Sequence, residues 1–337
     1  MANKQTVCAV IVTYNRKVLL LECLSAILRQ TYPLDAIYLI DNASTDGTRE
    51  LLMEKGYIKN ILEPTNEPLV QVNIVSMLSE MNKNKEVKTC YVRMHENTGG
   101  AGGFYEGVKR GHQNGYDWLW LMDDDAEPRP DCLEILFNGI ANIQDDRLAG
   151  IAALNIDVTG AVQKLHRGFI DKKKWQQIPL SEEKYNGGDR FVKIDYSSFV
   201  GLLISSGVVE RSGYPDKDFF IWFDDMEYCI RLAENGNIYL DKHAVIVHKD
   251  KLESEYMKDK EKDLWKRYYS DRNSMFLYKK YSKNNFFSWF ELSSRVFKGL
   301  VYILLFENFK FKRIRLLLMA YYDILFDIRG RKVSPEF

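Results

Sequence analysis

The sequence has no net charge, no paired cysteines and no long apolar run. Its 47 basic and 47 acidic side chains cancel over 337 residues. The five cysteines are odd in number and show no Cys-x-x-Cys spacing, which favours reduced thiols in the cytoplasm over a disulfide framework. No uncharged apolar run reaches the roughly 18 residues of a membrane-spanning helix, and the first residues lack the shape of a signal peptide. A hydrophobic share of 46% excludes disordered and collagen-like chains.

The zero net charge conceals an uneven distribution along the chain. Residues 249–337 contain 20 basic and 12 acidic side chains, a balance of +8. Residues 1–248 contain 27 basic and 35 acidic side chains, a balance of −8. We therefore expect two regions, an acidic body over residues 1–248 and a basic, aromatic tail over residues 249–337. The charge of the tail predicts contact with an anionic partner.

Strand-like apolar runs alternate with helical patterns in the body. This alternation predicts an α/β fold with a mixed sheet flanked by helices. The expected strands cover residues 7–12, 36–40, 89–94, 118–122, 148–154 and 196–205. The expected helices cover residues 17–30, a segment around 51–52 capped by Ser44 or Thr45, and residues 66–85 and 104–113.

Three consecutive carboxylates, Asp123, Asp124 and Asp125, follow the strand expected at residues 118–122. Adjacent carboxylates repel one another unless a cation offsets their charge. Mg²⁺ and Mn²⁺ take oxygen ligands and leave positions open for substrate phosphates. Ligands of open α/β sheets bind beyond the carboxyl ends of the strands, which is where the triplet would lie. The alternative is a solvated acidic turn in which Asp125 caps a following helix.

A glycine-rich segment, Asn97-Thr-Gly-Gly-Ala-Gly-Gly103, precedes the helix expected at residues 104–113. Its glycines let the backbone approach a ligand closely, and a helix N-terminus favours a phosphate. It lacks the spacing of a dinucleotide-binding fingerprint, so a tight connection is the alternative.

Two further acidic residues, Asp224 and Asp225, follow Trp222 at the expected start of a helix. One of them could act as a general base toward a sugar hydroxyl, whereas helix capping would account for the other. His248 ends the apolar run at residues 244–247. Its imidazole could complete a Mn²⁺ site with two aspartates, and a structural role is the alternative.

In their order along the chain, these motifs resemble family 2 glycosyltransferases of the GT-A fold. The resemblance covers roughly residues 6–280 and includes residues 10–16, residues 41–48, the aspartate triplet and residues 218–227. The glycine segment, the aspartate triplet and the last of these motifs are most similar to those of bacterial galactofuranosyltransferases, and residues 268–273 add to this similarity. Rhamnosyltransferases share much of the pattern.

The resemblance implies a role for each candidate residue. A nucleotide and donor-sugar pocket is implied for Thr13, Asn15, Arg16, Asp41, Asn97, Gly99, Gly100, Gly102, Asp124 and Trp222. A site for Mn²⁺ or Mg²⁺ is implied for Asp123, Asp125 and His248. The catalytic base is implied to be Asp225, with Asp224 beside it.

The resemblance also implies a reaction. Galactofuranose would pass with inversion from UDP-galactofuranose to a glycan or lipid-linked glycan in the synthesis of a bacterial cell-surface polysaccharide. A donor of dTDP-rhamnose is one alternative, and a non-catalytic module that binds a sugar nucleotide or glycan is another. The acceptor stays open, because residues 196–201 lack the tryptophan pair of the enzymes that make mycobacterial galactan.

The tail alternates apolar blocks with basic clusters over residues 284–332. This pattern is typical of helices that lie in an anionic membrane interface, and it predicts a peripheral protein at the inner face of the cell membrane. The alternative is a helical subdomain packed on the body or a homo-oligomer interface. We do not expect nucleic acid as a partner, since the acidic body and the triplet fit a sugar nucleotide better.

Overall fold

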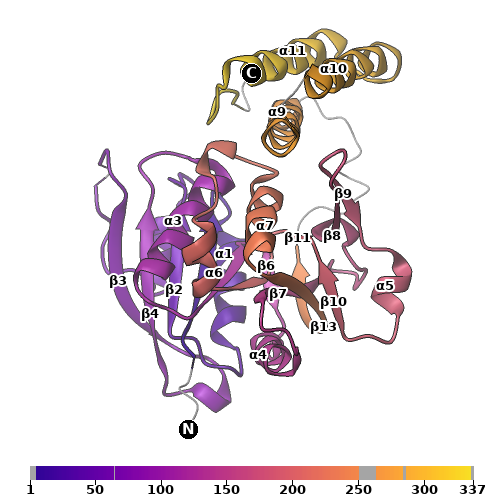
Figure 1. The fold of residues 1–337 in the computed structure, drawn as a ribbon. Helices are drawn as coiled ribbons and strands as arrows, with labels where there is room; N and C mark the ends of the chain where they lie inside the picture. Colours follow the sequence, from indigo (N-terminus) through magenta and orange to yellow (C-terminus); the bar gives the residue numbers. More distant parts are fainter. Residues whose placement is uncertain (1–4, 64, 250–262, 284–285, 335–337) are drawn as a thin grey trace.

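The computed structural model describes residues 5–63, 65–249, 263–283 and 286–334. A large mixed sheet runs through the body with helices on both faces, and three further helices form a layer above it (Figure 1). This architecture confirms the predicted α/β class.

The central sheet contains ten strands. Nine of them follow one another in the order β10 (Phe191–Ile194), β13 (Asn237–His248), β7 (Leu148–Ile156), β12 (Leu202–Ser205), β5 (Trp118–Asp123), β1 (Val7–Thr13), β2 (Ala36–Asp41), β4 (Glu86–Arg93) and β3 (Leu69–Ser76). The short β6 (Ala126–Pro128) pairs with the end of β13. Strands β5, β1, β2 and β4 are mutually parallel, so their carboxyl ends meet at one edge of the sheet.

Helices cover both faces of the central strands. Val10 of β1 belongs to the same buried cluster as Phe104, and Ile11 belongs to a second cluster with Leu24. Because neighbouring residues of a strand point to opposite faces, β1, which is apolar from Val7 to Val12, needs a helix on each side. The helices of the body are α1 (Lys17–Leu28), α2 (Thr48–Glu54), α3 (Gly99–Gln113), α4 (Cys132–Asn142), α5 (Glu182–Asn186), α6 (Ser206–Ser212) and α7 (Asp224–Asn235).

The helix expected over residues 66–85 is wrong. The structure has β3 there, antiparallel to β4 at the edge of the sheet, followed by the short 3₁₀ helix η1 (Glu80–Asn82). Val70, Val72 and Ile74 repeat with a period of two and are exposed on one face of the strand. Branched residues at this period favour a strand, and this preference outweighs the helical pattern.

Two other expectations about elements need correction. The strand expected over residues 196–205 is divided at Gly201, between β11 (Tyr196–Ser197) and β12. Gly201 has a φ of +84°, and a Cβ there would lie 2.3 Å from Cδ1 of Ile246, so only glycine fits the crossing. Neither Ser44 nor Thr45 caps α2, because its N-cap is Gly47 and the carboxylate of Asp46 accepts the hydrogen bond from the Thr48 amide at 3.1 Å.

A small second sheet lies beside the central one. Its three strands lie in the order β11, β8 (Arg167–Asp171) and β9 (Gln176–Pro179). The 3₁₀ helix η2 (Lys164–His166) directly precedes β8 in the sequence. Another 3₁₀ helix, η3 (Lys217–Phe219), precedes α7.

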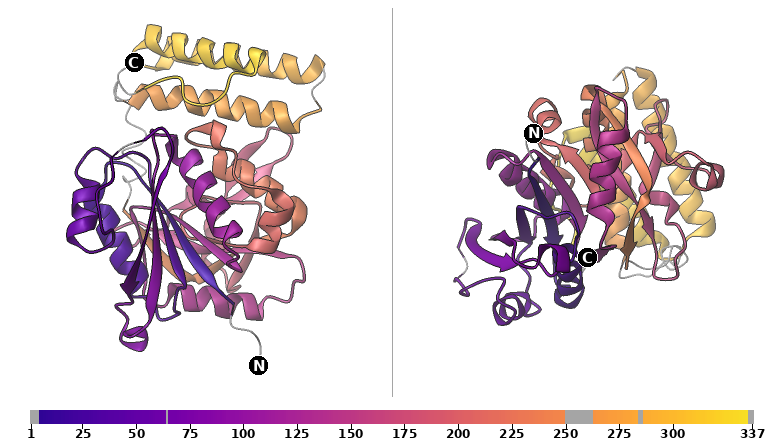
Figure 2. Two further views of the ribbon diagram at one scale, coloured as in Figure 1. Left: turned by 90° about the vertical axis from the view of Figure 1, so that its left-hand side faces the viewer. Right: turned by 90° about the horizontal axis from the view of Figure 1, so that it is seen from below.

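The tail is helical, as its composition indicated. It consists of α9 (Leu264–Tyr281), α10 (Phe286–Phe306) and α11 (Lys310–Phe326), with α9 between the body and the other two helices (Figures 1 and 2). Tyr268 and Leu316 of this layer share a buried cluster with Phe220 of the body. None of the helices in the described part of the chain is both long and apolar enough to cross a bilayer. The expected boundary at residue 249 stays a prediction, since residues 250–262 lie outside the described ranges.

Candidate active site

Three strand ends bring predicted site residues to one edge of the sheet. Thr13 is the last residue of β1, Asp41 the last of β2 and Asp123 the last of β5. In the parallel register, Thr13 lies opposite Asp41 and Val12 lies opposite Asp123. Because ligands of open α/β sheets bind beyond the carboxyl ends of the strands, this edge is the candidate site.

A turn places the aspartate triplet against the end of β13. After Asp123 the chain enters β6, whose Ala126 pairs with His248. Ligand atoms of Asp123, Asp125 and His248 therefore lie within 4.8 Å of one another. The structure brings all three predicted metal ligands together, and two carboxylates with one imidazole could hold Mn²⁺ or Mg²⁺.

Gln163, which sequence reasoning missed, orients the ring of His248. Its Oε1 lies 2.9 Å from Nδ1 of the imidazole, and its Nε2 donates to the main-chain oxygen of His248 at 3.4 Å. This pairing leaves Nε2 of the ring facing Asp125, whose Oδ1 is 3.2 Å away. Within the described ranges, no group donates a well-formed hydrogen bond to this buried oxygen. A carboxylate oxygen of this kind beside an imidazole nitrogen fits a cation shared by the two.

Asp124 points away from this cluster and toward β1. Its Oδ2 accepts a hydrogen bond from Oγ1 of Thr13 at 2.6 Å, and its Oδ1 lies 3.4 Å from the guanidinium of Arg16, which also pairs with Asp125. Asp124 and Asp125 are both only 3% exposed, so the alternative of a solvated turn is wrong. Asp125 does not cap the next helix either, because Asp131 occupies the N-cap of α4.

Burial and mutual repulsion perturb the triplet. Burial, followed by the charge of Asp125, raises the pKa of Asp123 to about 7. Burial raises the pKa of Asp124 to about 6 although Arg16 opposes the shift. Burial also raises the pKa of Asp125, but the adjacent imidazole of His248 and the charge of Arg16 bring it below its usual value. A divalent cation bound between such crowded carboxylates would offset their mutual repulsion.

The residues predicted to line the nucleotide pocket are tied together at the ends of β1 and β2. Asp41 is fully buried, and its two oxygens accept hydrogen bonds from the Tyr91 hydroxyl at 2.6 Å and the Ser44 amide at 2.7 Å. Oδ1 of Asn15 accepts a hydrogen bond from the Thr45 amide at 2.7 Å. Asp41 therefore fixes the loop that follows β2, and Asn15 links this loop to the end of β1.

The glycine segment begins a helix rather than preceding one. Helix α3 starts at Gly99, not near residue 104 as expected, and Oδ1 of Asn97 accepts a hydrogen bond from the Gly99 amide at 2.8 Å. Gly99 has a φ of +73°, and a Cβ there would lie 2.0 Å from the main-chain oxygen of Phe220. That oxygen also accepts a hydrogen bond from the Ala101 amide at 3.1 Å. The first turn of α3 is thus in direct contact with the loop that precedes α7.

Gly100 and Gly102 of the same segment have different surroundings. A Cβ at Gly102 would lie 2.3 Å from Oγ1 of Thr98, whereas a Cβ at Gly100 would meet nothing within 4 Å. The hydroxyl of Thr98 donates to Oδ1 of Asn42 at 2.9 Å, and Nδ2 of Asn42 donates to the Gly99 oxygen at 2.8 Å. These bonds join the glycine turn to the end of β2, so Gly100 is the glycine with open space in front of it.

The loop before α7 is strained. Phe220, Trp222 and Phe223 have φ values of +69°, +64° and +67°, a region that bulky side chains rarely adopt. Such conformations cost about 1–3 kcal/mol each and persist where the surroundings impose them, often at functional sites. Phe223 is the N-cap of α7 and makes no side-chain capping bond, so the capping explanation for the acidic pair is wrong. Trp222 is 41% exposed, so an acceptor could reach it.

The two acidic residues at the start of α7 differ in their surroundings. Asp224 is nearly buried, and this burial, followed by the charges of Asp225 and also Asp123, raises its pKa well above the usual value. Asp225 is more accessible, and its Oδ1 accepts a hydrogen bond from the Met226 amide at 2.7 Å. Burial raises the pKa of Asp225 to about 6, against the opposing charge of Arg167. With a pKa of about 6, Asp225 is ionised at neutral pH, and its greater accessibility makes it the better candidate for a base.

Sequence reasoning also missed three groups that support this arrangement. Arg167 is fully buried and donates to the main-chain oxygens of Ala153 and Val200, and its positive charge acts on Asp225. Arg272 and Asn273 of α9 contact the strained loop. These two residues belong to the segment noted for its similarity at residues 268–273, and this was the only signal that could have found them.

Residues 8–67 and 72–202, more than half of the chain, match the sequence family described as Glycosyl transferase family 2. The chain belongs to this family. Membership of glycosyltransferase family 2 confirms the predicted resemblance and the prediction of a glycosyltransferase at the level of the family.

Curated relatives of this family 2 chain include galactofuranosyltransferases. The galactofuranosyltransferase GlfT1 of Mycolicibacterium smegmatis is 28% identical over 239 residues, which make up 70% of this chain and 68% of the relative. The protein of the same name from Mycobacterium tuberculosis (strain H37Rv) is 27% identical over 235 residues, 69% of this chain and 66% of the relative. The chain thus spans about two thirds of the length of these relatives.

Solved structures share the fold of this family 2 chain. A structure of GalNAc-T7 with UDP, GalNAc and Mn²⁺ has a TM-score of 0.55 and 15% identity, covering 97% of this chain and 58% of the other. The structure of S. aureus TarS has a TM-score of 0.52 and 13% identity, covering 96% of this chain and 49% of the other. The similarity to these structures confirms the predicted GT-A fold.

Proposed function

We propose that the chain is a metal-dependent, inverting glycosyltransferase that transfers galactofuranose from UDP-galactofuranose to a hydroxyl of a glycan or lipid-linked glycan. The observation that carries the proposal is the proximity of two groups, since the charge of Asp123 acts on Asp224, the neighbour of Asp225. One is the ligand set of Asp123, Asp125 and His248, whose donor atoms lie within 4.8 Å of one another. The other is Asp225, a carboxylate whose pKa of about 6 leaves it ionised at neutral pH.

Asp123, Asp125 and His248 would hold Mn²⁺ or Mg²⁺. A divalent cation supplies Lewis acidity to a departing diphosphate. Arg16 lies beside the same carboxylates, with 46% of its side chain exposed, so it could also meet an anionic group of the donor. Thr13 fixes Asp124, and this keeps the middle carboxylate of the triplet out of the ligand set.

Transfer proceeds as a single displacement. The acceptor oxygen forms a bond to the anomeric carbon while the bond from that carbon to the diphosphate breaks. Asp225 takes the proton of the acceptor hydroxyl, and UDP leaves with the electron pair of the broken bond. Because no covalent glycosyl-enzyme forms, one base is enough and the configuration at the anomeric carbon inverts, as in inverting glycosidases. Trp222, exposed beside Asp225, offers a surface on which a sugar ring of the acceptor could stack.

The choice of donor rests on the galactofuranosyltransferases among the relatives. Purified protein incubated with a bacterial glycolipid extract should release UDP and transfer sugar from UDP-galactofuranose in the presence of Mn²⁺, and lose both activities with EDTA. NMR of the product should report the inverted anomer. Turnover of dTDP-rhamnose in place of UDP-galactofuranose would contradict the donor assignment. Binding of a donor without transfer under any metal would favour a non-catalytic module.

The tail supports a location at the inner face of the cell membrane in the synthesis of a cell-surface polysaccharide. Helices α10 and α11 form the outermost layer of the molecule (Figure 1). They expose large apolar side chains, among them Phe286, Phe287, Phe290, Phe297, Tyr302, Leu305, Phe306 and Phe311. Lys298, Lys310 and Arg315 are exposed on the same two helices. Aromatic groups that enter the interface beside cations that meet anionic headgroups fit a peripheral membrane contact.

Vesicle flotation tests this contact. The protein should float with vesicles that contain phosphatidylglycerol and remain largely unbound with phosphatidylcholine alone, and a double substitution of Phe297 and Phe311 by Ser should weaken flotation. If the protein is instead a dimer that this substitution dissociates, the apolar surface is an interface between copies.

A further inference from the structure

A helix of the tail holds the strained loop before α7. Asn273 lies in α9 and is 1% exposed. Its Nδ2 donates to the main-chain oxygens of Phe219 at 2.9 Å, Ile221 at 2.8 Å and Trp222 at 3.0 Å. One side-chain amide thus gathers three carbonyl groups of the loop in which Phe220 and Trp222 have positive φ values.

Arg272 fixes the orientation of this amide. Its Nε donates to Oδ1 of Asn273 at 3.0 Å, and since a guanidinium has donors only, the oxygen of the amide must face it and the nitrogen must face the loop. The same guanidinium donates to the Phe219 oxygen at 3.1 Å, the Asp218 oxygen at 3.3 Å and the Gly330 oxygen at 2.6 Å. Arg272 is fully buried, so these carbonyl groups provide the solvation of its charge.

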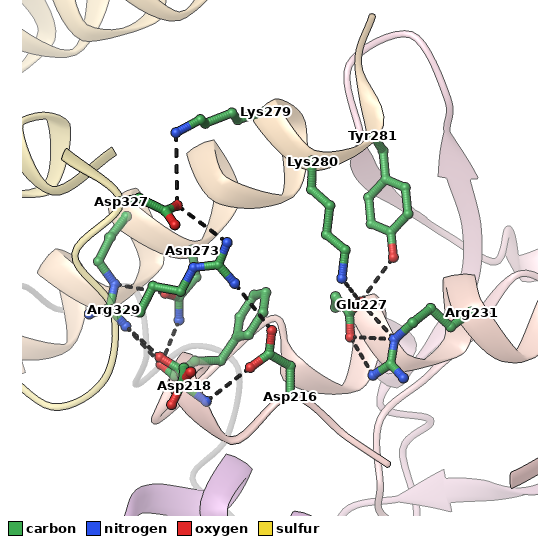
Figure 3. Close-up of polar contacts among 12 residues, drawn as sticks. Asp216, Asp218, Glu227, Arg231, Asn273, Lys279, Lys280, Tyr281, Asp327 and Arg329 are labelled. Carbon is green, nitrogen blue, oxygen red and sulfur yellow. Dashed lines mark hydrogen bonds and ion pairs between the residues drawn. The ribbon is translucent and has the colours of Figure 1, made fainter. Parts of the chain in front are cut away.

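The same helix is anchored again on the other side of the acidic pair. Glu227, one turn into α7, has a fully buried side chain that accepts hydrogen bonds from Lys280 at 2.6 Å and Tyr281 at 2.9 Å, both at the end of α9 (Figure 3). Arg231 of α7 pairs with the same carboxylate at 2.8 Å. Helix α9 therefore contacts the chain both before and after Asp224 and Asp225.

The segment after α11 completes the contact. Arg329 pairs with Asp216 at 3.4 Å, and Lys279 of α9 pairs with Asp327 at 3.8 Å (Figure 3). The Gly330 amide donates to the Asp218 oxygen at 2.8 Å. These contacts surround η3 and the start of the strained loop, so the loop is held from the tail and not only from the body.

We infer that Arg272 and Asn273 are positioning residues that hold the base-bearing loop in its strained form and thereby aim Asp225 at the acceptor hydroxyl. This inference rests on the proposed function, because it takes Asp225 as the base. Without the amide, the three gathered carbonyl groups lose their shared donor and the positive φ values can relax. The start of α7 then shifts, and a shift of about 1 Å at a reacting group costs on the order of 10²-fold in rate. Trp222 is the residue of the predicted donor pocket that lies in this loop. The ligands Asp123, Asp125 and His248 belong to other elements, and Asn42 holds Gly99 to the end of β2, so donor binding should largely persist.

A graded series at one position tests the inference. Asn273→Ser keeps one donor, Asn273→Ala keeps none, and Asn273→Asp keeps the shape but turns a carboxylate toward the carbonyl groups. We expect kcat to fall in this order, with a loss of about 10²-fold for Asn273→Ala and a larger loss for Asn273→Asp, while the KM for the sugar nucleotide stays within about twofold. Ser274→Ala is the matched control, because the Ser274 hydroxyl bonds only within α9, to the Asp271 oxygen at 3.0 Å, and it should leave both constants unchanged.

Hydrogen exchange supplies a readout that does not depend on turnover. In Asn273→Ala, amides of residues 218–225 should exchange at least about tenfold faster than in the wild-type protein, while the strands β1 and β5 keep their protection. If the variants do not fold, hydrogen exchange in the wild-type protein provides the test. Simultaneous exchange of residues 218–223 and of α9 supports the inference. Exchange of the loop while α9 stays protected overturns it.

The outcomes separate the two proposals. An Asn273→Ala variant with wild-type kcat, or one that raises the donor KM and leaves kcat unchanged, overturns the positioning role while the proposed reaction stands. A wild-type protein that transfers no sugar from either donor overturns the proposed reaction, and the exchange experiment still decides whether α9 holds the loop.

Discussion

The two acidic segments of the site are positioned in opposite ways. The aspartate triplet is held by the pairing of β5 with β1 and of β6 with β13, and its own charges oppose one another. The loop before α7 is strained in its backbone and is held by side chains of a helix about 50 residues further along the chain. The first segment therefore needs a counter-charge, and the second needs hydrogen-bond donors. Four changes, given from the largest expected effect to the smallest, break or sharpen this contrast.

Asp125→Ala should have the largest effect, because it removes a proposed metal ligand and the partner of His248 and Arg16 together. We expect sugar transfer to fall by at least about 10³-fold. The wild-type protein should gain thermal stability with Mn²⁺, by about 2.7 kcal/mol at a concentration 100 times the Kd, and the variant should lose this gain. Differential scanning fluorimetry with and without Mn²⁺ measures it. Asp146→Asn, a change at an exposed aspartate outside the site, is the control, and an Mn²⁺ shift retained by Asp125→Ala would contradict the assignment.

Asp225→Asn should lower kcat by about 10²–10⁴-fold and leave the donor KM nearly unchanged, since the lost group acts on the acceptor. In the wild-type protein kcat should rise with pH through about 6, because burial raises the pKa of Asp225 to that value and the base must be ionised. The variant should lack this acid limb.

The same raised pKa has a consequence for stability. The folded state binds the proton of Asp225 more tightly than the unfolded state does, so this group contributes stability below its usual pKa of 3.8 and loses it as the pH rises to about 6. Urea unfolding at pH 4 and pH 7 measures this contribution. Between pH 4 and pH 7 the free energy of unfolding of the wild type should fall relative to that of Asp225→Asn. An unchanged pH profile of kcat in the variant would refute the role of base.

Gln163→Ala should weaken metal binding about 10–100-fold without abolishing transfer at saturating Mn²⁺, as expected for a residue that orients a ligand rather than binding the ion. The physical reason is the loss of the partner of Nδ1 of His248. Titration of Mn²⁺ against the transfer rate measures the change. A fall in the rate at saturating Mn²⁺, with unchanged metal affinity, would mean that Gln163 acts elsewhere.

Gly99→Ala and Gly100→Ala form the matched pair with the smallest effect. A Cβ at Gly99 would overlap the Phe220 oxygen, whereas a Cβ at Gly100 would meet nothing within 4 Å. We expect Gly99→Ala to lower the free energy of unfolding by about 2 kcal/mol and to reduce transfer, and Gly100→Ala to leave stability within about 1 kcal/mol of the wild type. Chemical denaturation of both variants checks this, and equal stability of the two would mean that the loop adjusts without cost.

The sequence could predict what depends on neighbours along the chain. The strand ends at Thr13, Asp41 and Asp123 follow from apolar runs that stop at polar residues, and parallel pairing then places them together. The triplet is conspicuous because like charges at successive positions need an explanation. These local signals were enough for the family, the fold and the candidate metal ligands.

The rest depends on contacts between distant segments. Gln163 and His248 are 85 residues apart, and Asn273 and Phe219 are 54 residues apart. No periodicity or composition marks such a pair, because an asparagine that binds carbonyl groups looks the same as one on a surface. The error at residues 66–85 has another origin, since β3 is an edge strand whose alternating branched residues lie on the exposed face, so their alternation does not mark a buried face.

The contacts of Asn273 with the loop involve main-chain oxygens only. Every residue type presents the same main-chain carbonyl group, whatever its side chain. The residues at positions 219, 221 and 222 can therefore change during evolution while the hydrogen bonds from Asn273 to the loop persist. Trp222 could be exchanged for a side chain that suits another acceptor, with the geometry around Asp225 inherited unchanged. In this way the fold would separate the position of the proposed catalytic base from the recognition of the acceptor. Related proteins could then act on many glycans while Asp225 keeps its position.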